Sequence, residues 1–108
     1  VNMNIINSDN HTLIELNSDD SFELIINFLK KESTQGLHII INLFDVINYD
    51  LLVKNLLTFS LNWEKRNKSF ILVSSNIIKK HAKGLVVIKT LEEALDFFHM
   101  EELMRTIQ

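Results

Sequence analysis

The residues of this chain that could do chemistry are four histidines, two adjacent serines and two pairs of glutamates. The histidines lie far apart in the sequence, at His11, His38, His81 and His99. Zinc sites normally take their ligands at short, set spacings, and no such spacing occurs here. We therefore predict no metal site and no other cofactor. His38 stands in an apolar run and fits a hydrogen-bonded histidine of the core.

The serines and glutamates also lack the surroundings that catalysis needs. Ser74 and Ser75 follow an apolar run without a glycine elbow, so they fit turn hydroxyls better than a nucleophile. The glutamates form two adjacent pairs, Glu92–Glu93 and Glu101–Glu102. Neighbours on a helix point about 100° apart, which suits helix support and solubility rather than acid–base catalysis. The chain also has no cysteine and therefore no thiol nucleophile. Because the sequence contains no catalytic constellation, we expect a protein that is not an enzyme.

The composition indicates one globular unit of slightly acidic character. The chain has 108 residues, of which 46% are hydrophobic, and this predicts a single domain over residues 1–108. A net charge of −3 argues against a nucleic-acid binder, and the one dense basic run, KKHAK at 79–83, fits a solvated surface. No segment approaches the roughly 18 consecutive apolar residues of a membrane helix. We therefore expect a cytoplasmic protein without membrane insertion.

Hydrophobic periodicity predicts strands that alternate with helices. The predicted strands are 4–7, 11–16, 37–44, 69–75 and 84–89, and the predicted helices are 20–33, 50–66 and 91–108, with at most a short helix in 76–83. Asp20 and Thr90 stand where they can cap the first and last long helices. After the first hairpin, this alternation implies right-handed crossovers and a mostly parallel sheet. The predicted fold class is α/β, with a mixed sheet of about five strands, an N-terminal hairpin and three to four helices.

The stretch HIIINLFDVINYD, residues 38–50, leads from a buried-looking strand into the predicted helix at 50–66. It resembles the corresponding stretch of STAS domains, the family of bacterial anti-sigma-factor antagonists. In that family a strand is followed by NL, an acidic loop residue and the Asp of a DSSG motif. The stretches SFILVSSN and VVIKTLEEAL also resemble later parts of that domain, so the resemblance covers essentially the whole chain. It implies a STAS-like fold and a regulatory protein that binds another protein.

The chain departs from that family at the residue that carries the switch. Without a gap, Asp50 falls on the Asp of the motif, and Leu52 stands where signalling members have a serine that a partner kinase phosphorylates. Leucine has no oxygen to receive a phosphoryl group, so the resemblance implies binding that is constitutive or regulated elsewhere. The candidate partner-binding residues here are Tyr49, Asp50, Leu51, Leu52 and Lys54. The alternative is a plain helix start, in which Asp50 caps the helix and the leucines enter the core.

The last predicted helix has more apolar residues than one packed face requires. They are Phe97, Phe98, Met100, Leu103, Met104 and Ile107. One interpretation is a C-terminal helix of the core. The other is a helix that exposes some of these residues to a partner, which makes Met100 and Met104 candidate partner-binding residues.

We therefore expect a non-catalytic STAS-like interaction module that binds a protein, with a homodimer among its expected states. Two alternatives stay open. One is a conventional antagonist that is phosphorylated at another hydroxyl, such as Thr58, Ser60 or Ser74. The other is a small-ligand carrier or an enzyme accessory subunit.

Overall fold

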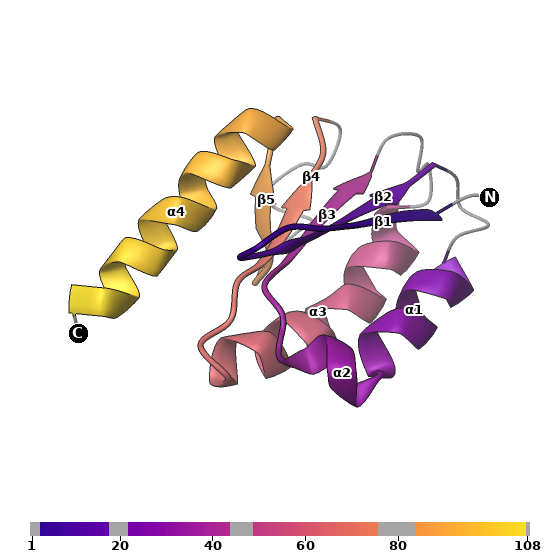
Figure 1. The fold of residues 1–108 in the computed structure, drawn as a ribbon. Coiled ribbons are helices and arrows are strands. Elements are labelled where there is room, and N and C mark those ends of the chain that lie inside the picture. Colours follow the sequence, from indigo (N-terminus) through magenta and orange to yellow (C-terminus); the bar gives the residue numbers. More distant parts are fainter. Residues whose placement is uncertain (1–2, 18–21, 44–48, 76–83, 108) are drawn as a thin grey trace.

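The structure is a computed structural model that describes residues 3–17, 22–43, 49–75 and 84–107, with the backbone alone for residues 49–51. Its five strands are β1 (Met3–Asn7), β2 (Thr12–Leu16), β3 (Ile39–Leu43), β4 (Phe70–Val73) and β5 (Val86–Ile88). Its four described helices are α1 (Phe22–Lys30), α2 (Glu32–Gln35), α3 (Tyr49–Lys65) and α4 (Leu91–Ile107). The predicted α/β fold, with a mixed sheet and an N-terminal hairpin, is confirmed (Figure 1).

The strands lie in the sheet in the same order as in the sequence. β1 is antiparallel to β2, and β2, β3, β4 and β5 run parallel to one another. Right-handed crossovers between strands that follow in one direction place the connecting helices on one face of the sheet. Accordingly, α1 and α3 cover one face, and α4 is the described helix that packs on the other (Figure 1).

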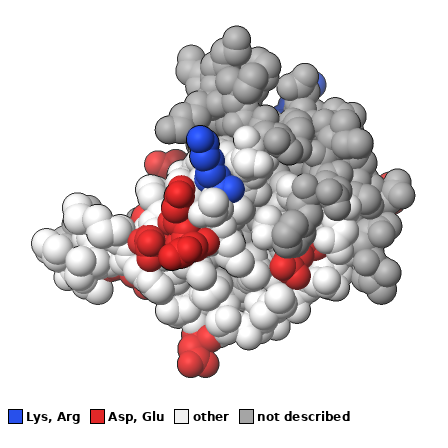
Figure 2. All heavy atoms as spheres, turned by 90° about the horizontal axis from the view of Figure 1, so that it is seen from above, with Lys and Arg blue, Asp and Glu red and all other residues white. Residues whose placement is uncertain are grey.

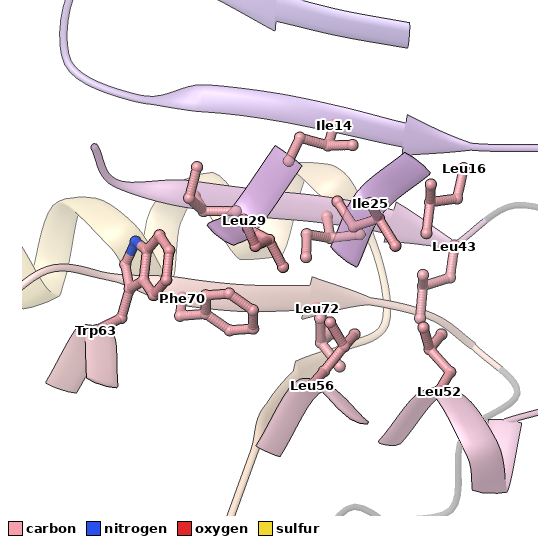
Figure 3. Close-up of a cluster of buried hydrophobic side chains, with 12 residues drawn as sticks. Ile14, Leu16, Ile25, Leu29, Leu43, Leu52, Leu56, Trp63, Phe70 and Leu72 are labelled. Atoms are coloured by element: carbon pink, nitrogen blue, oxygen red, sulfur yellow. The ribbon is translucent and has the colours of Figure 1, made fainter. Parts of the chain in front are cut away.

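The larger core lies between the sheet and the helices α1 and α3. Twelve buried side chains form it, and Figure 3 shows them converging from β2, β3 and β4 and from the two helices. The helical spacing in the sequence places Leu52, Leu56, Phe59 and Trp63 on one side of α3. Leu52, Leu56 and Trp63 are between 0% and 1% exposed, and Phe59 is partly buried against the same core. The indole N–H of Trp63 donates to the carbonyl oxygen of Leu37 at 2.8 Å, so the one polar atom of this buried ring has a partner.

The smaller core lies between the opposite face of the sheet and the first half of α4. Ile40, Ile71 and Val73 meet Ala94 and Phe98 there. The predicted cap of this helix is confirmed, because Glu93 N–H donates to Thr90 Oγ1 at 3.1 Å. One helix cannot cover five strands, so the β1–β2 side of this face stays more open, and Ile6 on β1 is 46% exposed.

Two helix ends were not predicted from the periodicity: the break between α1 and α2, and the C-terminal end of α3. The predicted helix at 20–33 is interrupted at Lys31, whose extended backbone (φ −68°, ψ 137°) separates α1 from α2. The break lets α2 turn and bury Thr34 ahead of β3. Helix α3 ends at Lys65, and Asn67, two residues later, adopts the left-handed region (φ 56°). The N–H groups of Asn67 and Lys68 donate to the carbonyl oxygens of Glu64 and Trp63. The predicted cap at Asp20 and the predicted short helix in 76–83 lie outside the described residues.

Candidate interaction surface

The beginning of α3 was the first predicted contact region. Helix α3 begins at Tyr49, one residue before the predicted start, so Tyr49 and Asp50 form its first two positions. The side chains of Tyr49, Asp50 and Leu51 lie outside what the structure describes. Their proposed role in partner binding therefore stays a prediction.

Leu52 and Lys54 have described side chains, and they lie in opposite environments. Leu52 is 1% exposed and packs in the larger core, so it cannot contact a partner while the protein is folded. Its assignment as a contact residue is therefore corrected, and the alternative that it enters the core is confirmed. The physical reason is the helical repeat, which aligns Leu52 with Leu56 on the side of α3 that faces the sheet. Lys54 points to solvent and stays available.

The other hydroxyls considered for phosphorylation also differ in access. Ser60 is 9% exposed and Ser74 is 6% exposed, so a kinase could reach neither without opening the fold. Thr58 lies on the exposed side of α3. Among these three hydroxyls, the alternative of a conventional phosphorylated antagonist therefore depends on Thr58.

Helix α4 has two unlike sides in its second half. Ala94 and Phe98 are fully buried against the sheet. On the opposite side of the helix, four apolar residues point to solvent, with exposed fractions of 61% for Met100, 59% for Leu103, 54% for Met104 and 72% for Ile107. Their spacing of i, i+3, i+4 and i+7 makes one continuous stripe. We call these four residues the α4 stripe. The interpretation that this helix exposes part of its apolar surface is confirmed.

A shallow groove of about 360 Å³ runs beside the α4 stripe. Phe97, Met100 and Met104 form its apolar wall, and Asn67, Glu101 and Arg105 form its polar wall. Seen from above, the far end of α4 extends at the left of the molecule as a mostly uncharged surface (Figure 2). An apolar surface with a mixed-charge border is the usual composition of a protein contact.

The structure does not join the two predicted contact regions. Helix α3 lies on one face of the sheet and α4 on the other (Figure 1). The candidates of α3 and the candidates Met100 and Met104 of α4 therefore belong to separate surfaces. Of the two, the α4 stripe is the one whose apolar side chains are described and exposed.

A polar network holds the second half of α4 to the sheet, and sequence reasoning did not predict it. Ser69, just before β4, is 1% exposed. Its hydroxyl donates to Glu101 Oε1 at 2.8 Å and accepts from Arg105 Nη1 at 3.0 Å. Arg105 also donates to Glu102 Oε1 at 2.8 Å. Ser69 is buried and bonded to both partners, so its hydroxyl is neither accessible to a substrate nor activated as a nucleophile. We therefore interpret this network as an anchor that orients α4.

His38 extends this network to β3. The backbone N–H of Ser69 donates to His38 Nδ1 at 3.0 Å, so the proton of the neutral ring is on Nε2, which lies 3.2 Å from Glu102 Oε1. The interpretation of His38 as a hydrogen-bonded histidine is confirmed, and its side chain is 13% exposed. Burial is the main cause that lowers the pKa of His38, and the nearby Lys68 and Arg105 add to it, while Glu102 opposes it.

The histidines are less isolated than their spacing predicts. The rings of His11, His38 and His99 each lie 5.0–5.5 Å, centroid to centroid, from the buried ring of Phe98. Burial and the neighbouring His99 lower the pKa of His11. A signal for this grouping exists in the sequence, since HTLIEL and HIIINL both place a histidine directly before an apolar strand, and those two strands are parallel neighbours.

The lowered pKa values predict a stability that depends on pH. His11 and His38 bind protons less readily in the folded chain than in the unfolded chain, so folding is favoured above the ordinary histidine pKa of about 6.5 and loses stability as the pH falls below it. Protonation of His38 Nδ1 would also displace its bond from Ser69. We expect the urea midpoint to decrease between pH 7.5 and pH 5, and to decrease less in His38→Gln. An equal decrease in both proteins would contradict this assignment.

Within the described ranges, no three histidine, cysteine, aspartate or glutamate side chains are placed to hold a metal ion together. Likewise, no described helix has the length and apolar content to cross a bilayer. The class that the fold and surface define is an α/β domain that presents an anchored helix with an exposed apolar stripe. Comparison with protein-family models and with curated proteins gives no match for this chain.

Proposed function

We propose that this protein is a non-catalytic, STAS-like interaction module that binds another protein through the α4 stripe. The observation that carries the proposal is the orientation of α4, which is anchored to the sheet on one side and exposes four apolar residues on the other. Exposed apolar residues that gather in one stripe often mark a binding surface. The STAS-like part is supported by the hairpin followed by parallel strands, which is the layout that the resemblance implies.

The partner that fits this stripe is an amphipathic helix of a different protein. Apolar residues at i, i+3, i+4 and i+7 form the ridge that a facing helix covers in helix–helix recognition. The groove beside Met100 and Met104 gives such a helix a place for its apolar side chains, and Glu101 and Arg105 offer both charges at its border. In this proposal a bacterial regulatory or adaptor protein would use the surface in the cytoplasm.

Replacing Met100 and Met104 by glutamate tests the proposal. We expect partner binding to weaken about 100-fold or more, because two carboxylates would have to be desolvated at a contact that is apolar in the wild type. The free energy of unfolding should change by no more than about 0.5 kcal/mol, because both side chains are exposed. The measurement is affinity capture from the native cell, followed by isothermal titration calorimetry with the purified partner.

A matched control places two glutamates at exposed apolar residues on the other face of the sheet. Leu24 on α1 is 45% exposed and Leu61 on α3 is 49% exposed, and their double replacement by glutamate should leave binding unchanged. A partner that binds all three proteins equally would contradict the proposal. Sedimentation that shows self-association lost only in the Met100/Met104 variant would identify the occupant as a second copy instead.

A further inference from the structure

A depression of about 440 Å³ lies at the carboxyl ends of the parallel strands, beside the first turn of α4. Its apolar floor includes Val73 and Leu91. Its polar groups come from β2, from β3, from the chain after β4 and from the chain after β5; they are Glu15, Asn42, Ser74, Ser75, Lys89 and Thr90. In open α/β sheets, ligands commonly bind outside the carboxyl ends of the strands. This location is far from the α4 stripe and is independent of the proposed function.

Asn42 is the feature of this depression that the fold leaves unexplained. It is 9% exposed, and no described residue forms a hydrogen bond with its side-chain amide. Its strand register pairs it with Glu15 on one side and with Val73 on the other, and all three line the depression. Buried amides are normally hydrogen-bonded, since an unsatisfied one destabilises the fold. Among the described residues an apolar side chain at this place would pack better, so the amide is a candidate contact for a bound ligand.

The charges around Asn42 determine which kind of partner fits. The lining contains one carboxylate, Glu15, and one ammonium group, Lys89. The first turn of α4 adds Glu92 and Glu93, which disfavour an anion although a helix N-terminus attracts one. The hydroxyl of Thr90 already accepts a bond from Glu93 N–H and is free to donate another. The site therefore offers mixed donors and acceptors beside an aliphatic floor, with no excess of positive charge.

We infer that this depression binds a small uncharged polyhydroxylated molecule of the sugar or polyol class. The amide of Asn42 donates to one ligand hydroxyl and accepts from another, and the carboxylate of Glu15 accepts from a neighbouring hydroxyl. Ser75, Lys89 and Thr90 close the opposite side, and the C–H groups of the ligand lie against Val73 and Leu91. A volume of about 440 Å³ falls in the range of small-molecule sites.

The test is a titration of the ¹⁵N-labelled chain with D-ribose, D-glucose and myo-inositol, with inorganic phosphate and glycine as charged comparison probes. We expect at least one polyol to give saturable shifts of the Asn42 side-chain amide and of the backbone amides of Val73, Ser75 and Thr90. Phosphate and glycine should give none there. In Asn42→Leu, binding should weaken about tenfold or more, which equals about 1.4 kcal/mol. Its melting temperature should stay the same or increase, because the unsatisfied amide is gone.

The matched control is Asn27→Ala, which removes an exposed asparagine from α1 on the other face and should bind like the wild type. Three results would overturn the inference: no saturable shift with any polyol, shifts from phosphate or glycine instead, or wild-type binding by Asn42→Leu. The first of these would indicate that the amide of Asn42 holds only water. Should Asn42→Leu not fold, the wild-type titration alone still decides, since it locates the shifts.

Discussion

Replacing Phe98 by alanine is expected to lower the free energy of unfolding by about 3–5 kcal/mol. Phe98 is the largest fully buried side chain that α4 contributes to the smaller core. The substitution removes its contacts with Ile40 and Ile71 and leaves a cavity beneath the helix. Equilibrium unfolding in urea, followed by circular dichroism, gives the value.

The adjacent Phe97→Ala serves as the control for Phe98→Ala. Phe97 has the same side chain, but it is only partly buried at the edge of the same core. Its replacement should cost about 1 kcal/mol. Since Phe98 attaches α4 to the sheet, Phe98→Ala should also weaken the fixed presentation of the α4 stripe. Equal losses in the two variants would show that the buried side of α4 is not the one described.

Leu52→Ser, which restores the residue type of the STAS motif, is expected to destabilise the protein by about 3–5 kcal/mol. Leu52 is 1% exposed in the larger core, so serine would leave a cavity and place a hydroxyl among apolar side chains (Figure 3). The new hydroxyl would also be inaccessible to a kinase while the chain is folded. Urea unfolding measures the first effect, and intact mass after incubation with a kinase measures the second.

Lys54→Ser is the control for Leu52→Ser, because it introduces the same hydroxyl into the same helix at an exposed position. Its unfolding free energy should stay within about 0.5 kcal/mol of the wild type. A Leu52→Ser protein as stable as Lys54→Ser would place position 52 at the surface. That result would make Leu52 a candidate partner-binding residue again.

The parts of the fold that depend on local periodicity could be predicted from the sequence. Leu52, Leu56 and Trp63 repeat at helical spacing, so their shared burial follows from the geometry of α3. The nearly continuous apolar run of β3 predicts a strand covered on both faces, and all five of its residues are buried. The break at Lys31 could not be predicted in this way, because it depends on how α2 must turn to bury Thr34.

The candidate site could be predicted only in part, because it depends on which elements become neighbours. The excess of apolar residues in the last helix indicated an exposed stripe, yet only packing decides that Phe98 faces inward and Met100 outward. The anchor formed by Ser69, Arg105 and His38 joins residues more than thirty positions apart. Such contacts cannot be predicted from the charge and spacing of residues along the sequence. The amide of Asn42, which has no hydrogen bond from the described residues, is likewise visible only once the neighbouring strands are placed.

The position of β1 has a consequence for the behaviour of concentrated solutions. β1 pairs with β2 along one side, and no described strand pairs with its other side. Its two isoleucines, Ile5 and Ile6, are 40% and 46% exposed, and the strand has neither proline nor charge to discourage an incoming chain. At such an unpaired edge the sheets of separate molecules can join edge to edge and begin to aggregate. Only its length of five residues limits that growth.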